Sequence, residues 1–156
     1  MAEALALPHR HLADLTLKVA FDRMTTIGET PAGLRRIAPI IGGSCTGARL
    51  DAVVVEGADW VINRPDGVMV IDVRLTLQTQ DSARIYLTYQ GRFLASPDAM
   101  ARFRRGQLLS PDEYSLAIMA RFECGMEAYA WLNNAIVVGI GEQTATGPVY
   151  RLFEIG

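Results

Sequence analysis

The sequence predicts an all-β fold, a single-domain antiparallel β-barrel of the calycin-like meander type with one short helix. Its length of 156 residues suits one domain, and with half of its residues hydrophobic and only 21% charged it can bury a core. Runs of β-branched and aromatic residues also recur at short intervals between turn signals. We expect a closed barrel rather than a two-sheet sandwich, because closure removes exposed strand edges.

The N-terminal third contains one clear strand and a glycine-rich stretch. Apolar and polar residues alternate from His11 to Phe21, the two-residue period of a strand with one buried face. The stretch from Met24 to Gly47 carries many Gly and Pro residues and predicts a long structured loop with a short strand inside it. The single domain is expected to span residues 1–156, with 1–10 as a flexible segment.

The rest of the chain predicts a series of strands joined by short turns. They are expected at Arg49–Glu56, Asp59–Asn63, Val68–Thr79, Arg84–Phe93, Tyr114–Glu123, Ala128–Gly141 and Val149–Ile155. A helix is expected from Ser96 to Arg105, because Ser96 can cap it and Pro97 suits its first position. The turn 64–67 reads Arg-Pro-Asp-Gly, so Asp66 has a structural explanation.

Two of these strands have one apolar and one polar face. The odd positions from Met69 to Leu77 are apolar, and the even positions carry Asp72, Arg74 and other polar groups. Tyr86 belongs to the polar face of the next strand. Such a face either is solvated or lines a barrel mouth that holds one small ligand. If it lines the mouth, the apolar face points outward and predicts a homodimer or higher oligomer that buries residues around Ile71 to Leu77.

Charge and hydropathy exclude several classes of partner. The formal charge of −2 provides no basic surface for a phosphate backbone, so no nucleic-acid partner is expected. The longest uncharged apolar stretch, Ala128 to Gly141, is too short to cross a bilayer. The first ten residues do not resemble a secretory signal. We therefore expect a cytoplasmic protein with no membrane partner.

The cysteines and histidines do not form a recognisable reactive centre. Cys45 and Cys124 are far apart, and free cysteines of this kind are typically small buried apolar residues. His9 and His11 both lie in the N-terminal segment, which disfavours a zinc site and a catalytic triad. We expect no metal and no cofactor.

Four residues are candidates for catalysis. Glu123 ends an otherwise apolar strand, where partial desolvation would raise its pKa, although a salt bridge to an arginine explains it equally well. Asp72 and Arg74 share one strand face and form either a surface ion pair or a polarised pair in the lumen. Tyr86, on the same side, could steady a developing oxyanion or be simply solvated.

Aromatic side chains suggest how a ligand would be positioned. Trp60 is either a core residue or a flat platform for a ligand. Tyr129, Trp131 and Asn133 alternate along the strand expected there, and two aromatics with one amide suit an aromatic ligand with a polar handle. Core packing with one satisfied amide is the alternative.

Four sequence stretches occur together in a recognisable order. They are Gly28–Gly43, Gly57–Gly67, Ile85–Arg92 and Phe122–Asn133. In this combination the chain resembles the family called domain of unknown function 3237, or uncharacterised protein family 0311, from about Leu15 to Glu154. The resemblance implies a compact antiparallel β-barrel and self-association. Arg36 and Arg92, which lie in two of the stretches, complete the expected ligand-binding set.

The chain departs from the family pattern near its third quarter. Ala117-Ile118-Met119 stands where an aromatic-Arg-Thr run is usual, and Asn134 stands where Arg usually follows Trp-Leu-Asn. The loss of two polar side chains suggests a more apolar pocket than in the family at large.

These observations favour a cofactor-independent lyase, isomerase or cyclase that acts by acid–base chemistry in the barrel cavity. Its substrate would be a small, apolar compound that is aromatic or enolisable. Glu123 or Asp72 would transfer the proton, and Arg74 and Tyr86 would steady negative charge. The alternative is a non-catalytic small-molecule binding or carrier protein with the same barrel.

Overall fold

The computed structural model describes residues 5–156, which form nine strands, one α-helix and three short 3₁₀ helices. The strands are β1 (His9–Val19), β2 (Thr25–Thr30), β3 (Gly33–Thr46), β4 (Asp51–Asn63), β5 (Met69–Thr79), β6 (Arg84–Ala95), β7 (Tyr114–Cys124), β8 (Ile136–Thr144) and β9 (Gly147–Ile155). The helices are α1 (Pro97–Arg104), η1 (Phe21–Arg23), η2 (Pro111–Glu113) and η3 (Glu127–Asn134).

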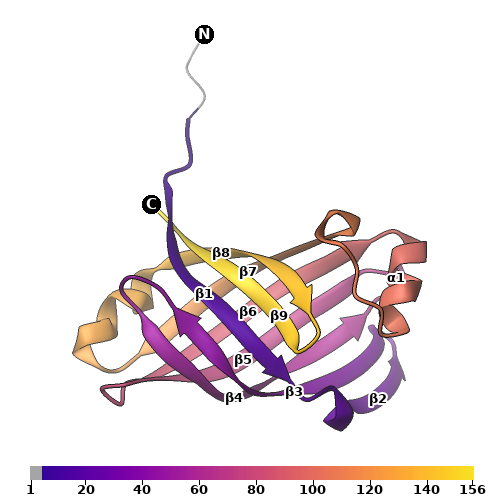
Figure 1. Cartoon of the computed structure of the whole chain (residues 1–156), viewed down its shortest axis with the longest axis horizontal. Coiled ribbons are helices and arrows are strands. Elements are labelled where there is room, and N and C mark those ends of the chain that lie inside the picture. Colours follow the sequence, from indigo (N-terminus) through magenta and orange to yellow (C-terminus); the bar gives the residue numbers. More distant parts are fainter. Residues whose placement is uncertain (1–4) are drawn as a thin grey trace.

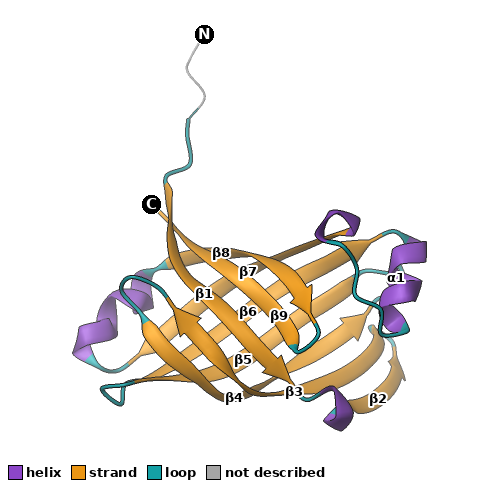
Figure 2. Cartoon of the chain, viewed as in Figure 1, coloured by secondary structure: helices purple, strands orange, loops and turns teal. Residues whose placement is uncertain are grey.

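Eight strands close into an antiparallel barrel, as the sequence predicts. The strands from β3 to β9 pair in chain order, and β1 pairs with both β9 and β3, which closes the circle. The ninth strand, β2, pairs only with the first half of β3 and extends the sheet at one end (Figure 1). The helix α1 lies at the same end, and η3 lies at the other (Figure 2).

The apolar faces of the strands line the barrel interior. Met69, Ile71, Val73, Leu75 and Leu77 of β5 all point inward, and each is at most 7% exposed. An eight-stranded barrel has an interior that side chains fill or that holds one small ligand. Each buried apolar side chain contributes about 1.5–3 kcal/mol by leaving water. The expectation that Ile71 to Leu77 form a surface for self-association is therefore wrong, because these residues are the core.

The glycine-rich stretch 24–47 is mostly strand and not, as expected, mostly loop. Its glycines lie where the extended chain turns or bends. Gly33 starts β3 with a φ of +129°, and Gly43, with a φ of +134°, lies beside a bulge in the pairing of β1 with β3. A long strand interrupted at such points gives the same sequence pattern as a loop.

Two further expectations about strands need correction. Arg49–Glu56 and Asp59–Asn63 belong to a single strand, β4, whose pairing with β5 shifts between Val54 and Glu56. The stretch Ala128–Gly141 is not one strand, because its first part forms η3 and only Ile136 starts β8. Tyr129, Trp131 and Asn133 therefore do not alternate along a strand face.

The predicted helix and turn are both present. The hydroxyl oxygen of Ser96 accepts a hydrogen bond of 3.1 Å from the amide of Ala99, and Pro97 is the first residue of α1. In the turn before β5, Asp66 pairs with Arg64 and accepts a hydrogen bond from the amide of Val68. Local hydrogen bonds of this kind depend on few residues, which is why sequence predicts them well.

β1 begins at His9, within the segment 1–10 that the sequence suggested to be flexible, and residues 1–4 lie outside the described part of the chain. Both cysteines are buried and free. No helix among residues 5–156 is long and apolar enough to cross a membrane.

Candidate functional site

The polar faces of β5 and β6 point outward from the barrel. Because the odd positions of β5 fill the core, Asp72 and Arg74 lie on the outer wall, and Tyr86 of β6 is 43% exposed on the same side. The expectation that these residues face the barrel cavity is thus wrong. The apolar faces are the buried ones, because removing apolar side chains from water lowers the free energy more than removing polar side chains would.

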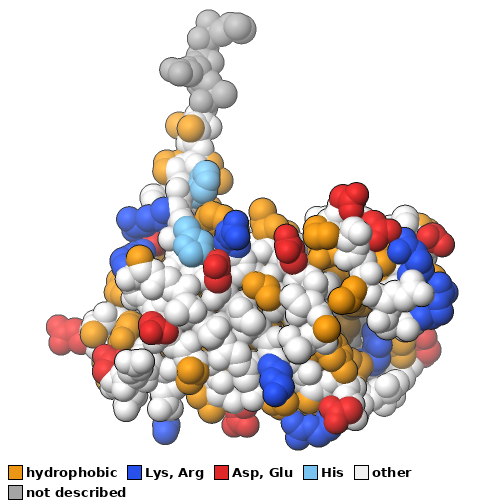
Figure 3. Space-filling view, in the orientation of Figure 1, with side chains coloured by type: hydrophobic (Ala, Val, Ile, Leu, Met, Phe, Trp, Pro, Cys, Tyr) orange, Lys and Arg blue, Asp and Glu red, His pale blue; other side chains and the backbone are white. Residues whose placement is uncertain are grey.

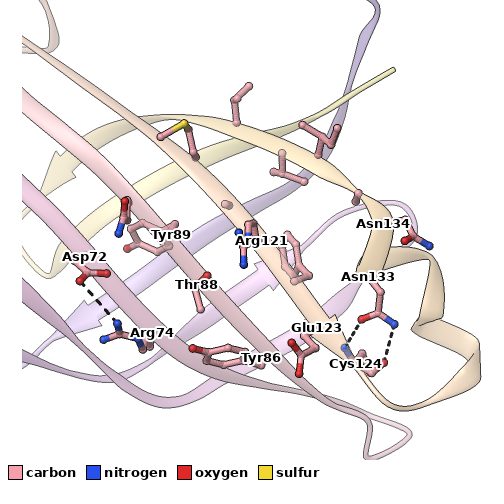
Figure 4. A pocket seen from close by; sticks show the side chains of 18 of the residues that line it. Asp72, Arg74, Tyr86, Thr88, Tyr89, Arg121, Glu123, Cys124, Asn133 and Asn134 are labelled. Atoms are coloured by element: carbon pink, nitrogen blue, oxygen red, sulfur yellow. Dashed lines mark hydrogen bonds and ion pairs between the residues drawn. The ribbon is translucent and has the colours of Figure 1, made fainter.

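A groove on this outer wall nevertheless brings five of the expected site residues together. It has a volume of about 1210 Å³ and runs across β5, β6 and β7 towards η3 and β8. Asp72, Arg74, Tyr86, Glu123 and Asn133 all line it (Figure 4).

The charged groups of the groove are loosely paired. Arg74 lies 4.0 Å from the Asp72 carboxylate and 5.1 Å from the ring of Trp60, which also faces outward. Tyr86 and Glu123 are partners across β6 and β7, and Figure 4 shows their side chains next to each other. Arg74 and Glu123 are exposed, so water and salt screen these charges.

Asn133 and Tyr129 hold η3 in place. The side-chain oxygen of Asn133 accepts a hydrogen bond of 2.7 Å from the amide of Cys124, and its nitrogen donates one of 2.9 Å to the Cys124 carbonyl (Figure 4). The Tyr129 hydroxyl donates to Asp81 at 3.0 Å. These hydrogen bonds attach η3 to the ends of neighbouring strands, and they occupy the groups that were expected to contact a ligand.

Trp131 and Arg92 also make contacts within the chain. The guanidinium of Arg49 lies over the Trp131 ring at 4.0 Å, a cation–π contact. Arg92 is exposed and donates to the carbonyl of Gly91. Neither residue lines the outer groove.

Arg36 is the one expected site residue that faces the barrel interior. It is the register partner of Val61, a core residue, and it donates a hydrogen bond of 2.7 Å to the side-chain oxygen of Asn63. Asn63 lies on the same face of β4, two residues beyond Val61, and is only 6% exposed.

Sequence reasoning missed a partly buried, inward-facing carboxyl group, that of Asp59. Asp59 lies two residues before Val61 and so on the same, inward face of β4, and its Cα partner in β5 is the core residue Val73. The pairing of β4 with β5 is interrupted just after it and resumes in the same register at Ile62. At this break, a carboxylate oxygen of Asp59 accepts a hydrogen bond of 3.0 Å from the amide of Asp72, in place of a main-chain carbonyl.

Burial raises the pKa of Asp59 to about 7. The negative charge of Asp72 adds to the rise, while the hydrogen bond from the Asp72 amide and the charge of Arg35 oppose it. A carboxyl group in this environment exchanges a proton close to neutral pH. That property is the one expected of Glu123 from sequence.

Two buried tyrosines lie near Asp59 inside the barrel. The rings of Tyr89 and Tyr150 meet edge to face, with centroids 5.2 Å apart. Burial raises the pKa of both phenols, and the negative charge of Asp59 raises them further. Both phenols thus stay protonated and can act as hydrogen-bond donors.

Comparison with known proteins places the chain in a family. Residues 10–155 match the family described as protein of unknown function DUF3237. The chain belongs to this family. A UPF0311 protein of Bradyrhizobium diazoefficiens is 31% identical to this DUF3237 protein over 140 residues, which cover 90% of this chain and 92% of the relative. A UPF0311 protein of Clostridium acetobutylicum is 25% identical over 142 residues, 90% of each chain.

Solved structures of other proteins share the barrel of this DUF3237 protein. A conserved protein of unknown function from Rhodopseudomonas palustris superposes with a TM-score of 0.91 at 26% identity, covering 98% of this chain and all of that one. A β-barrel-like protein from Acinetobacter baumannii gives 0.84 at 28% identity, with both chains fully covered. An enzyme from Penicillium herquei gives 0.72 at 18% identity, covering 100% and 99%, which shows a shared fold alone.

A sequence signal for Asp59 exists, but it is weak. Asp59 lies in one of the stretches that carry the family resemblance, and it alternates with Val61 and Asn63. The bulge between Val54 and Glu56 changes which residues of β4 face inward, so alternation counted from the start of the strand would turn Asp59 outward. Only the pairing with β5 shows where it lies.

Proposed function

We propose that this DUF3237 protein is an enzyme that transfers protons without a cofactor, a lyase, isomerase or cyclase acting on a small, largely apolar compound. Asp59 is the proposed proton-transfer group. The observation that carries the proposal is the position of its carboxyl on the inner face of the barrel wall, in register with Val73 and then Tyr89, with a pKa of about 7.

The surroundings of Asp59 suit the removal of a proton next to a carbonyl group. Its carboxylate form would take the proton, and a phenol of Tyr89 or Tyr150 would donate a hydrogen bond to the oxygen on which negative charge develops. The apolar core around these groups strengthens such interactions, because little water competes for them. An aromatic or enolisable substrate fits this chemistry.

The outer groove is a second place for the same chemistry. There, Glu123 or Asp72 would transfer the proton, and Arg74 and Tyr86 would stabilise charge. Trp60 beside Arg74 would position the ligand, and Arg92, Tyr129 and Trp131 would contribute only if ligand binding rearranged their present contacts. We favour Asp59 because it faces the barrel interior, whereas Glu123 is exposed on the outer wall.

The alternative function is binding or transport of a small molecule without chemistry. The volume of the outer groove, about 1210 Å³, favours it, because a groove of this size can hold a ligand without a buried acid. The Penicillium herquei enzyme supports the catalytic proposal to the extent that the same barrel can carry an active site.

An NMR titration of carbon-13-labelled aspartates separates the two functions. We expect one carboxyl to titrate at about 7 and to disappear from the spectra of Asp59→Asn. All aspartates titrating near 4, the usual range, would contradict the assignment. Once a substrate is found, Asp59→Asn should abolish turnover, whereas Glu123→Gln and Asp72→Asn should retain it. Turnover that depended on Glu123 and not on Asp59 would move the active site to the groove.

A further inference from the structure

Arg36 and Asn63 form a polar pair on the inner face of the barrel, at the end near α1. Their hydrogen bond of 2.7 Å joins β3 to β4, and around Asn63 the register partners are the apolar residues Leu34 and Met69. Met69 in turn pairs with Phe93, whose ring stacks on Phe103 with centroids 4.7 Å apart. The pair thus lies against an apolar, partly aromatic surface.

Each member of the pair has a buried donor without a partner. The Nε atom of Arg36 and the Nδ2 atom of Asn63 are enclosed, and neither makes a hydrogen bond within the described residues 5–156. The amide of Asn63 cannot simply be turned over, because its nitrogen would then face the guanidinium of Arg36. A buried donor left unpaired is unfavourable and uncommon in folded proteins, so two together need an explanation.

The charge of Arg36 is also uncompensated. No carboxylate in the described part of the chain lies within ion-pair distance of it, and its one side-chain partner is the neutral Asn63. The charged group that acts on it is Arg104 of α1, which has the same sign. Burial and the charge of Arg104 lower the pKa of Arg36. Figure 3 shows basic side chains at this end of the molecule with acidic side chains among them, and Arg102 of α1 is paired with Asp98 and Glu113.

We propose that Arg36 and Asn63 bind the anionic oxygen of a small organic acid, a carboxylate whose apolar body packs against Leu34, the partly buried register partner of Asn63. Such a group accepts hydrogen bonds from both free donors and supplies the missing negative charge. Arg36 and Leu34 are only partly buried, so an acid can approach the pair from this end of the barrel.

A carboxylate site at Arg36 names the substrate class of the proposed enzyme, and its catalytic role rests on that proposed function. Asp59 pairs with Ala38, and Arg36 is two residues before Ala38 in β3, so the two sites are roughly 7 Å apart along the strand. A single small molecule can span this separation. The carboxylate would be held at Arg36 while Asp59 acts on the carbon skeleton.

Binding of phenylacetate, measured by calorimetry and by chemical-shift changes, tests the proposal. We expect phenylacetate to bind and its neutral amide, phenylacetamide, to bind at least about tenfold more weakly. Arg36→Gln should weaken phenylacetate binding at least about tenfold. Asn63→Asp should do the same while keeping the fold, because the new carboxylate gives Arg36 an internal counter-ion. Arg84→Gln, which removes the same charge from an exposed position, should bind as the natural chain does.

Three results would overturn the proposal: no binding of phenylacetate up to its solubility limit, equal binding of the neutral amide, or unchanged binding in Arg36→Gln. Thermal unfolding followed by circular dichroism checks that each variant is folded. The measurement is independent of catalysis, because Asp59→Asn should still bind phenylacetate. If phenylacetate does not bind, the pKa of Asp59 measured by NMR still tests the proposed function. If Asp59 does not titrate near 7, the binding of phenylacetate still tests the carboxylate site.

Discussion

Asp59 makes the stability of the barrel depend on pH. Its pKa is about 7 in the folded chain and 3.8 when unperturbed, so between these values the folded state holds a proton that the unfolded state has released. The stabilising contribution of the protonated form is therefore complete below the unfolded pKa and is lost as the pH rises through the folded pKa. Three pKa units correspond to at most about 4 kcal/mol.

We predict that Asp59→Asn removes most of this fall in unfolding free energy between pH about 4 and about 7. Urea unfolding at several pH values measures it. Asp66→Asn is the control, because hydrogen bonds from Arg64 hold the pKa of Asp66 below its usual range and give a pH dependence of the opposite sign. A pH profile of Asp59→Asn that matched the natural chain would show that folding does not shift the pKa of Asp59.

At the scale of the elements, the seam between β1 and β3 is the contact that closes the barrel. Gly43 of β3 pairs with Leu17 of β1, and a Cβ atom there would overlap the main-chain carbonyl of Thr16. Its φ of +134° is also unfavourable for any other residue. At the neighbouring Gly42, a Cβ atom would meet no other atom within 4 Å.

Gly43→Ala should therefore destabilise the protein by about 3 kcal/mol or more, and Gly42→Ala by less than about 1 kcal/mol. Urea unfolding of the two variants at one pH gives both values. Equal losses at the two positions would mean that the seam can move to make room, and that closure of the barrel tolerates a side chain there.

At the scale of the whole molecule, self-association remains a prediction, but it requires a surface other than the core residues of β5. Among the exposed apolar side chains, Met119, Ile136 and Ile140 gather on the outer face of β7 and β8, each at least 65% exposed. Met119 pairs directly with the exposed Val138, which lies between Ile136 and Ile140 on the same face of β8, so the side chains form one patch. Such a patch commonly marks an interface between copies.

We predict that the natural chain has a mass of twice 17.1 kDa or a higher multiple, measured by light scattering. Ile140→Lys places a charge in the patch, so this variant should have the mass of a single chain. Val53→Lys is the matched control, because Val53 is 58% exposed on β4 and should tolerate the charge without dissociation. A mass of 17.1 kDa at every concentration of the natural chain would refute self-association.

The sequence by itself determined the all-β class, the closed meander and the local structures. The cap at Ser96 and the turn at Asp66 depend on a few neighbouring atoms, and alternation in β5 depends on the geometry of one strand. Of the expected site residues, Arg36 faces the barrel interior, and its contact with a ligand stays a prediction. These features follow from short-range physics, which a sequence displays directly.

Only the tertiary structure decided which strand face is inside and what lies there. Alternation defines two faces of β5, but the apolar one faces the barrel interior because burial there removes it from water. The positions of Asp59 and Asn63 depend on the bulge at Val54 and on pairing with β3 and β5. The burial of Asp59 and the missing counter-ion of Arg36 arise from groups distant in the chain, so no local pattern could predict them.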